Sequence, residues 1–185
     1  MEEDAHSIEV RIAMFSDVKF VNAILEEMER SARQRGTGIA KRSPQAVCKK
    51  IYDGLAVIAV DGDRWVGFSY VQAWSDERFV SNSGLIVNPA YRHHGVAGMI
   101  KKRIIALCGE LYPNATIFSI TTGAAVMAMN HKLGFEPVTY EAIAQDEEFW
   151  DQCKQCVNYP ILLAQGRKRC LCTALALTPE VRRQH

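Results

Sequence analysis

The segment from residue 85 to residue 103, LIVNPAYRHHGVAGMIKKR, constrains the fold more than any other part of the chain. An apolar run typical of a buried strand leads into a short loop, and helical spacing of apolar residues begins directly after Gly95. Backbone N–H groups at a helix start lack partners within the helix, and together with the helix dipole they form an anion site. Gly95 and Gly98 carry no side chain that would keep phosphate oxygens away, and Arg92 would add further donors. The segment therefore predicts a strand–loop–helix unit that binds phosphate.

Periodic spacing of apolar residues predicts the elements around this unit. A strand is expected where apolar residues alternate, and a helix where they recur every three or four positions. Ser16 and Ser43 are expected to cap the first two helices. The predicted order is a strand at 8–15, helices at 16–33 and 44–53, strands at 55–60, 64–74 and 79–87, a helix at 95–111, a strand at 115–122, a helix at 124–134 and a strand at 135–140. This order predicts a mixed α/β fold in which helices pack on one sheet.

The chain is expected to form one domain over residues 1–185, with a core at 8–140 and a C-terminal extension at 141–185. Its 185 residues and 48% hydrophobic content suit a single core. In the extension, two apolar stretches at 157–164 and 170–177 flank a basic turn. We interpret them as a hairpin that completes the sheet.

Charge and hydropathy exclude several classes of partner. The 22 Lys and Arg nearly balance the 21 Asp and Glu, and a net charge of +1 supplies no field that would attract nucleic acid. The N-terminus is acidic and lacks the apolar run of a secretory signal, and no apolar stretch approaches the length of a membrane span. We therefore expect a cytoplasmic protein that contacts neither nucleic acid nor a membrane.

Six cysteines occur in a chain long enough to fold without disulfides, so reduced thiols are expected. Cys153, Cys156, Cys170 and Cys172 leave two interpretations open, four thiolates for a zinc ion or thiols packed in the core. The spacing of Cys170 and Cys172 is shorter than that of a zinc knuckle, and alternate residues of a strand face the same side. We favour buried reduced thiols and expect no metal.

Three short segments in this order of elements resemble the GCN5-related N-acetyltransferase (GNAT) superfamily. Residues 92–97, RHHGVA, fit its pyrophosphate loop, which reads Arg or Gln, two residues, Gly, one residue, and Gly or Ala. Residues 87–89 and 132–135 stand where that superfamily has V-x-P and K-x-G-F. The resemblance covers about residues 8–140, and it implies a mostly antiparallel sheet flanked by helices and the binding of acetyl-CoA or another acyl-CoA. The residues implied in cofactor binding are Ile86 and Val87 along the pantetheine, and Arg92, His93, His94, Gly95, Val96, Ala97 and Gly98 around the pyrophosphate.

Acyl transfer to an amine needs a neutral amine, a polarised thioester carbonyl and a protonated leaving thiolate. The resemblance assigns the second task to a backbone N–H close to Val87. The glutamate that often takes the amine proton in this superfamily is absent, because the aligned positions hold Ser81, Asn82 and Ser83, and Asn130 replaces the frequent tyrosine acid. We take Ser83 and Asn130 as candidate catalytic residues, with catalysis resting on positioning. The alternative is that both side chains satisfy only local hydrogen bonds.

A basic loop is expected at 33–42, between the first two helices, a region that in the resembled superfamily borders the acceptor pocket. Cations there would favour a substrate with carboxylates, because guanidinium groups bind carboxylates through paired hydrogen bonds. Arg35, Lys41 and Arg42 are the candidates for this contact, and a solvated basic loop is the alternative.

Several segments outside the loop, among them GTGIAKRSP, NSGLIV and CLCT, look like a Bacteroidetes subgroup of the superfamily that is linked to arginine biosynthesis. This resemblance implies transfer of an acetyl or succinyl group to the amine of a small molecule, with glutamate as the candidate. A catalytically silent acyl-CoA sensor and a peptide or protein N-acetyltransferase are the alternatives. A homodimer is left open.

Overall fold

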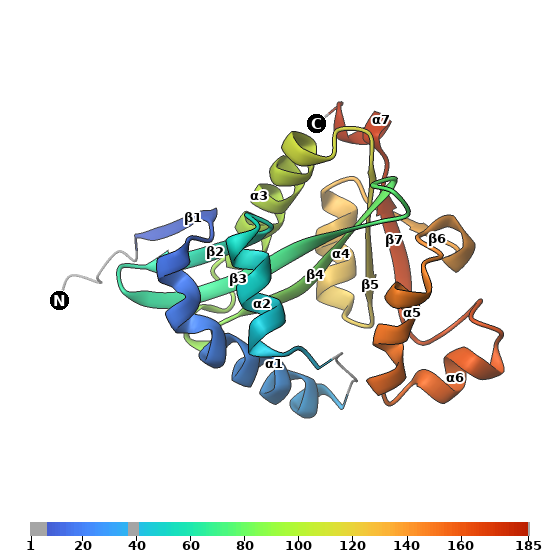
Figure 1. The fold of residues 1–185 in the computed structure, drawn as a ribbon, viewed down its shortest axis with the longest axis horizontal. Coiled ribbons are helices and arrows are strands. Elements are labelled where there is room, and N and C mark those ends of the chain that lie inside the picture. Colours follow the sequence, from blue (N-terminus) through green and yellow to red (C-terminus); the bar gives the residue numbers. More distant parts are fainter. Residues whose placement is uncertain (1–6, 37–40, 185) are drawn as a thin grey trace.

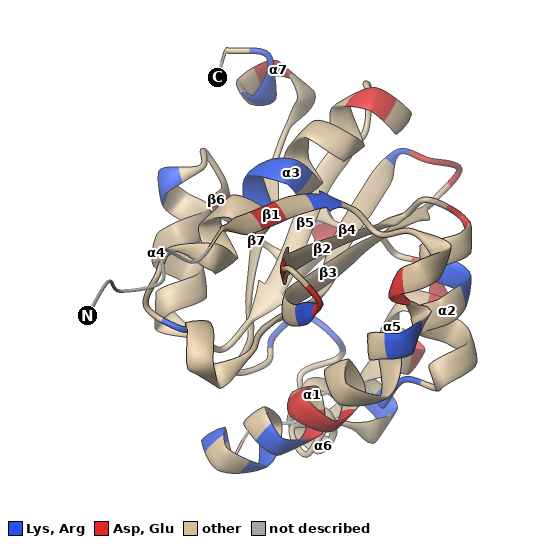
Figure 2. Cartoon of the chain, turned by 90° about the vertical axis from the view of Figure 1, so that its left-hand side faces the viewer, with Lys and Arg blue, Asp and Glu red and all other residues tan. Residues whose placement is uncertain are grey.

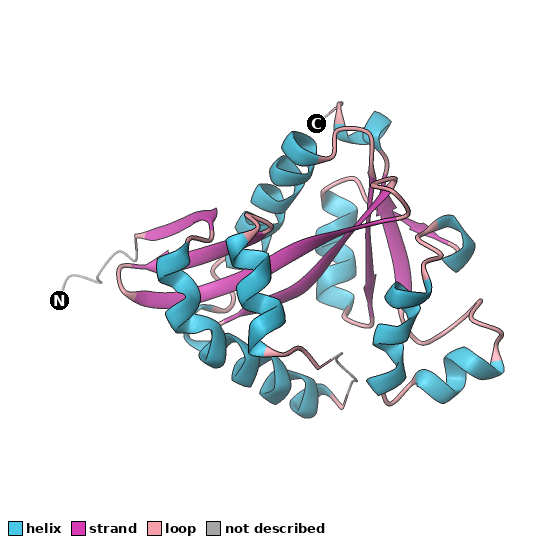
Figure 3. Cartoon of the chain, viewed as in Figure 1, coloured by secondary structure: helices cyan, strands magenta, loops and turns pink. Residues whose placement is uncertain are grey.

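The structure is a computed structural model that describes residues 7–36 and 41–184. Its centre is a seven-stranded sheet in the order β1-β2-β3-β4-β5-β7-β6, with helices on both faces (Figures 1 and 3). The strands are β1 (Ile8–Ile12), β2 (Ala56–Asp61), β3 (Arg64–Trp74), β4 (Phe79–Val87), β5 (Thr116–Thr121), β6 (Glu136–Val138) and β7 (Thr173–Leu177). The α-helices are α1 (Val21–Arg35), α2 (Pro44–Tyr52), α3 (Val96–Leu111), α4 (Ala124–Lys132), α5 (Glu147–Asp151), α6 (Tyr159–Ala164) and α7 (Pro179–Arg182). Short 3₁₀ helices are η1 (Phe15–Phe20), η2 (Pro89–Tyr91), η3 (Tyr140–Ala142) and η4 (Gln152–Gln155).

The sheet is mostly antiparallel, as expected, and its single parallel pairing among the described strands opens a gap. Strand β4 pairs with β5 only over residues 79–81 and 116–118, and the two strands part beyond that point (Figure 1). The second half of β4 therefore keeps pairing with β3 on one side, and among the described strands its other edge has no neighbour. An unpaired strand edge offers backbone N–H and C=O groups to a ligand.

Alternation along β2 explains how both faces of the sheet are covered. Ala56, Ile58 and Val60 pack against the side of α1 and α2, whereas Val57 and Ala59 pack against the side of α3. A strand covered on both faces is apolar throughout, and all five residues are buried. Charged residues lie mainly on helices and loops, and the middle of the sheet is almost free of them (Figure 2).

The N-terminal region differs from the sequence prediction in its first helix. Ser16 does not cap it, because residues 15–20 form η1 and the carboxylate of Asp17 accepts the N–H of Met14 (2.7 Å) instead. Helix α1 runs on to Arg35 and ends at Gly36, which adopts φ 62°. Residues 33–35, expected in the basic loop, are thus helical, and residues 37–40 of that loop lie outside the described residues.

The second helix is confirmed: Ser43 Oγ accepts the N–H of Ala46 (3.1 Å), and Pro44 occupies the first turn.

The predicted C-terminal hairpin is wrong. The first apolar stretch forms helix α6, in which Pro160 stands in the first turn and favours a helix start over a strand. Only the second stretch forms a strand, β7, and it inserts between β5 and β6, antiparallel to both. The extension packs on the domain through an aromatic cluster, whose buried members include Trp74, Phe118, Phe149 and Trp150.

All six cysteines lie in the described part of the chain and are free thiols. Burial raises the pKa of Cys172 to about 12 and that of Cys153 to about 11. Within residues 7–36 and 41–184, no group of three or more His, Cys, Asp or Glu is placed to hold a metal ion. No helix in the same ranges is both long enough and apolar enough to cross a membrane.

Candidate active site

The loop between β4 and α3 forms an open cradle of backbone N–H groups. His93 and Gly95 adopt positive φ angles of 67° and 76°, which turn the chain sharply into the helix. Asn88 fixes the start of the loop, since its side chain accepts the N–H of Ala90 (3.1 Å) and donates to the carbonyl of Trp65 (3.0 Å). An ideal Cβ atom at Gly98 would meet nothing within 4 Å. Helix α3 begins directly after Gly95, and the first N–H groups of a helix lack intrahelical partners, so this end of α3 can serve as an anion site.

This cradle borders a cavity of about 810 Å³ between β4, α3 and α4. The predicted cofactor residues that line it are Ile86, Val87, Arg92, His93, Gly95, Val96, Ala97 and Gly98; His94 does not. Arg35, expected at the acceptor, lines this cavity as well, together with Lys102 and Lys132. The two lysines are site residues that sequence reasoning missed, although Lys102 stands one helical turn after Gly98.

Arg92 braces the loop. Its Nη2 lies 2.6 Å from Glu27 Oε1, and its Nε donates to the carbonyl of Val87 (3.2 Å). Glu27 is only 7% exposed, and its other oxygen pairs with Arg30 (2.7 Å). The guanidinium is thus held between α1 and the end of β4. The loop motif does not predict a contact with Glu27, which lies 65 residues away in the sequence. The sequence does show a glutamate between two apolar residues of α1, Ile24 and Met28, which are buried in the structure.

We expect Arg92→Ala to lower the free energy of unfolding by about 2 kcal/mol, because it removes a charged partner from the buried carboxylate of Glu27. Urea unfolding of the purified protein measures the change. Arg103→Ala is the matched control: Arg103 pairs with the exposed Glu110 (3.0 Å), so its loss should cost less than 1 kcal/mol. Equal losses in the two variants would show that the Arg92–Glu27 pair has no special role.

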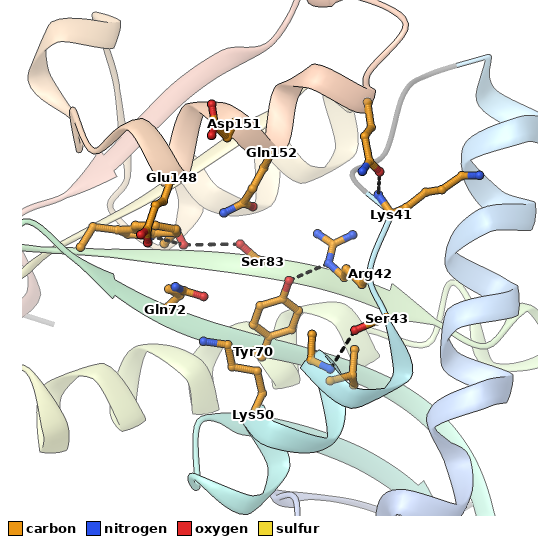
Figure 4. Close-up of a pocket in the computed structure, with 15 residues that line it drawn as sticks. Lys41, Arg42, Ser43, Lys50, Tyr70, Gln72, Ser83, Glu148, Asp151 and Gln152 are labelled. Carbon is orange, nitrogen blue, oxygen red and sulfur yellow. Dashed lines mark hydrogen bonds between the residues drawn. The ribbon is translucent and has the colours of Figure 1, made fainter.

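A second cavity, of about 440 Å³, lies where β3 and β4 face α2 and α5 (Figure 4). Ser83, Lys41 and Arg42, three of the predicted site residues, line it together. Its floor includes Tyr70 and Trp74. The other lining residues are Ser43, Ala46, Val47, Lys50, Gln72, Ser81, Glu148, Asp151, Gln152 and Gln155.

A bulge in β4 separates the two cavities. The register against β3 shifts between Phe68 and Tyr70, and Gly84 adopts φ 65° at that place. A Cβ atom at Gly84 would lie 2.7 Å from Tyr70 Cε1, so a side chain does not fit. The bulge leaves Ser83 in the smaller cavity and Ile86 in the larger one. Bulges that redirect neighbouring side chains are common beside active sites.

Hydrogen bonds hold the walls of the smaller cavity. Arg42 Nε donates to the hydroxyl of Tyr70 (2.6 Å), and the backbone N–H of Lys41 donates to Gln155 Oε1 (3.3 Å). Trp74 Nε1 donates to Ser81 Oγ (2.8 Å), and Ser83 Oγ lies 3.5 Å from the same oxygen. Burial lowers the pKa of Lys50, which carries a third cation into this wall.

The opposite wall is acidic and comes from the C-terminal extension. Glu148, Asp151, Gln152 and Gln155 recur at helical spacing through α5 and η4 and line the cavity. Glu148 and Gln152 extend from this helix toward the strands (Figure 4). Sequence reasoning missed this face, although its spacing is readable in EEFWDQCKQ. The cavity thus has cations on one wall and carboxylates on the other.

Asn130 is not brought together with Ser83. It is fully buried on α4 and lines neither cavity, and in the described part of the chain its side-chain nitrogen and oxygen have no hydrogen-bond partner. The side-chain amide of Asn82, on β4, donates to Ser69 Oγ on the neighbouring strand β3 (2.7 Å). The catalytic assignment of Asn130 stays a prediction.

Comparison of the sequence with protein-family models and with curated proteins gave no match. Solved structures do match. N-acetylglutamate synthase from Neisseria gonorrhoeae, complexed with coenzyme A and N-acetyl-glutamate, aligns with a TM-score of 0.65 and 14% identity over 92% of this chain and 35% of that chain. This chain therefore spans about a third of that enzyme's length.

Two further structures cover most of both partners. A Mycobacterium tuberculosis protein in complex with CoA has a TM-score of 0.64 and 17% identity, over 92% of this chain and 98% of that chain. A GNAT superfamily phosphinothricin acetyltransferase from Sinorhizobium meliloti, in complex with AcCoA, has a TM-score of 0.60 and 17% identity, over 92% and 86%. The chain therefore has the fold of the GCN5-related N-acetyltransferases.

Proposed function

We propose that this protein is an acyl-CoA-dependent N-acyltransferase that transfers an acetyl or succinyl group to the amine of a small molecule bearing carboxylates. The observation that carries the proposal is the pair of cavities on one strand. Ser83 of the smaller cavity and Leu85 of the larger one stand two residues apart on β4, about 7 Å along a strand. A donor in one cavity and an acceptor in the other would bring their reacting atoms together at the bulge.

The larger cavity has the chemistry that coenzyme A requires. The N–H cradle at Gly95–Gly98 suits the pyrophosphate, and Arg35, Lys102 and Lys132 add cations for the phosphates. The unpaired edge of β4 at Ile86 and Val87 offers backbone groups to the amides of the pantetheine. An acyl-CoA is thus the proposed donor.

The smaller cavity suits an acceptor that carries both signs of charge. Lys41, Arg42 and Lys50 would hold carboxylates, and Glu148 in the acidic wall would hold an ammonium group. L-Glutamate is the first candidate, since the neighbour from Neisseria was solved with N-acetyl-glutamate. The proposal also includes membership of the Bacteroidetes subgroup, a role in arginine biosynthesis and a cytoplasmic location. It leaves a homodimer open.

A catalytically silent acyl-CoA sensor is the second candidate. It is favoured by the serines on β4 where a glutamate is frequent, and by the burial of Asn130 away from both cavities. The sensor would bind acyl-CoA without consuming it. A peptide or protein N-acetyltransferase would instead need a peptide amine as acceptor.

We expect the purified protein to release free thiol from acetyl-CoA or succinyl-CoA in a manner that depends on L-glutamate, and the faster donor identifies the acyl group. A thiol-reactive chromophore measures the release, with each donor alone as the blank. n-Butylamine is the matched control, because it offers an amine without carboxylates and should support little turnover. Saturable CoA binding with no turnover across a broad panel of amines and peptides would contradict the enzyme and establish the sensor.

A further inference from the structure

We propose that Glu148 is the general base of the transfer, supplied by the C-terminal extension in place of a glutamate on β4. This inference rests on the proposed function and deepens it. Its basis is that Glu148 is held in the wall of the acceptor cavity and reaches from α5 toward strands β3 and β4, where Ser83 lies (Figure 4).

The backbone that carries Glu148 is firmly attached to the sheet. Phe149 packs edge-on against Trp74 at 5.5 Å and against Phe118 at 5.0 Å between ring centroids. Trp150 is 4% exposed, and its Nε1 donates to the carbonyl of Ala144 (3.1 Å). Helix α5 therefore buries Phe149 and Trp150 in the aromatic cluster while the side chain of Glu148 faces the cavity.

The start of α5 is fixed as well. The carboxylate of Asp146 accepts the backbone N–H of Ser75 (3.0 Å) and also its hydroxyl, which ties the helix to the turn between β3 and β4. A catalytic carboxylate needs this kind of rigid support to stay in reach of the reacting atom.

The neighbouring carboxylates are already engaged. Asp151 pairs with Lys154 (2.8 Å), and Glu147 pairs with Arg167 (2.8 Å). Within residues 7–36 and 41–184, Glu148 has no ion-pair or hydrogen-bond partner. The hydroxyls of Ser81 and Ser83 can orient a water molecule but are poor bases. Glu148 is thus the cavity carboxylate that is available to accept a proton.

The chemistry balances without a further reactant. Glu148 takes one proton from the ammonium of the acceptor, directly or through a water at Ser83, and passes it to solvent. The neutral amine then forms its N–C bond to the thioester carbon, and the C–S bond breaks. The second amine proton goes to the leaving sulfur, so one amide, one free thiol and one solvent proton result.

We expect Glu148→Gln to lower kcat about 100-fold, to leave the dissociation constant of CoA within about threefold of the wild type, and to weaken L-glutamate binding by a much smaller factor than the loss in kcat. Thiol release and isothermal titration calorimetry measure the two effects on the full chain. The deficit should narrow as the pH rises from 7 to 9.5, because more of the acceptor amine is then neutral without a base. The titratable or charged groups that line the cavity around Glu148 are Lys41, Arg42, Lys50, Tyr70 and Asp151.

Two variants serve as controls. Glu147→Gln removes the adjacent carboxylate, which does not line the cavity, and should keep wild-type kcat. Asp151→Asn changes the charge of the same wall and should act mainly on the KM of the acceptor. Glu148→Asp, which restores a carboxylate, should recover part of the lost rate and keep the wild-type pH profile.

The outcomes separate the two proposals. If Glu148→Gln matches the wild type at every pH, or if Asp151→Asn loses kcat equally, Glu148 is not the base and the acyltransferase stands. If the wild type itself shows no acceptor-dependent thiol release, the proposed function fails, and the role of Glu148 fails with it. Unfolding curves for each variant show whether a loss of activity comes from a loss of structure. If Glu148→Gln unfolds, Glu148→Asp takes its place: partial recovery of kcat supports the base, and wild-type kcat in a folded variant without the carboxylate contradicts it.

Discussion

Replacing Gly98 by valine should weaken CoA binding about 1000-fold and leave the protein folded. Gly98 lies in the first turn of α3 and lines the larger cavity, and a Cβ atom there would meet none of the described residues within 4 Å. The new methyl groups would therefore project into the space assigned to the pyrophosphate. Losing two charge-assisted hydrogen bonds from backbone N–H groups, at about 1.5–3 kcal/mol each, accounts for a change of this size.

Titration calorimetry with CoA measures the affinity, and thermal unfolding checks the fold. Gly109→Val is the matched control, because Gly109 lies on the same helix, also has open space around its Cβ position and stands eleven residues from the cradle. It should bind CoA as the wild type does. Normal CoA affinity in the Gly98 variant would remove the cradle from the cofactor site.

Gly95 is a poorer place for the same test. Its φ of 76° lies in the left-handed region, where a β-branched residue is strained whatever the space around it. A Gly95 variant would therefore mix a folding defect with a binding defect. The motif at 92–97 contains Gly95 and would favour it for this test, whereas the backbone angles favour Gly98.

Local patterns account for the parts of the molecule that the sequence predicted. The passage from β4 through the loop into α3 is set by neighbouring residues, and so are the caps and turns around α2. The prediction of a strand at 157–164 is wrong because a short apolar run fits a buried strand and a helix equally well. Pro160 decides between them, because it stands in the first turn of α6 and favours the start of a helix.

Contacts between distant segments account for what was missed. Glu27 and Arg92 meet across 65 residues in the sequence. The acidic wall lies at the smaller cavity because the aromatic cluster holds α5 beside β3. The spacing of Glu148, Asp151 and Gln155 shows a polar helical face but not what it faces. The motif at residues 92–97 describes the core of the domain, so it does not identify a candidate base such as Glu148 in the C-terminal extension.

The burial of Lys101 is also set by contacts between distant segments, and replacing this residue should change the stability of the protein strongly. The residue follows the cradle by one turn of α3 and would be expected at the surface, yet it is 1% exposed. In the described part of the chain its ammonium has no hydrogen-bond partner, and it lies 4.8 Å from the centroid of the Phe135 ring. Burial lowers its pKa to about 7. A charged lysine in this place opposes folding.

We expect Lys101→Met to raise the free energy of unfolding by about 3 kcal/mol at pH 7. Methionine fills a similar volume without a charge, and the loss of the contact with Phe135 offsets part of the gain. Lys102→Met, a change at the exposed neighbouring position, is the control and should alter stability by less than about 0.5 kcal/mol.

The pH dependence tests the cause. Between pH 7 and the unfolded pKa of about 10.4, the unfolded chain holds one proton on Lys101 that the folded chain has released, so the wild type gains stability as the pH rises. Below pH 7 both states hold the proton and the penalty is constant. The advantage of Lys101→Met should therefore be largest at or below pH 7 and shrink by up to about 1.4 kcal/mol per pH unit above it. Urea unfolding of both proteins at pH 6, 7.5 and 9 measures this difference. An advantage that stays constant with pH, or a variant less stable than the wild type, would show that the ammonium of Lys101 is not penalised by burial.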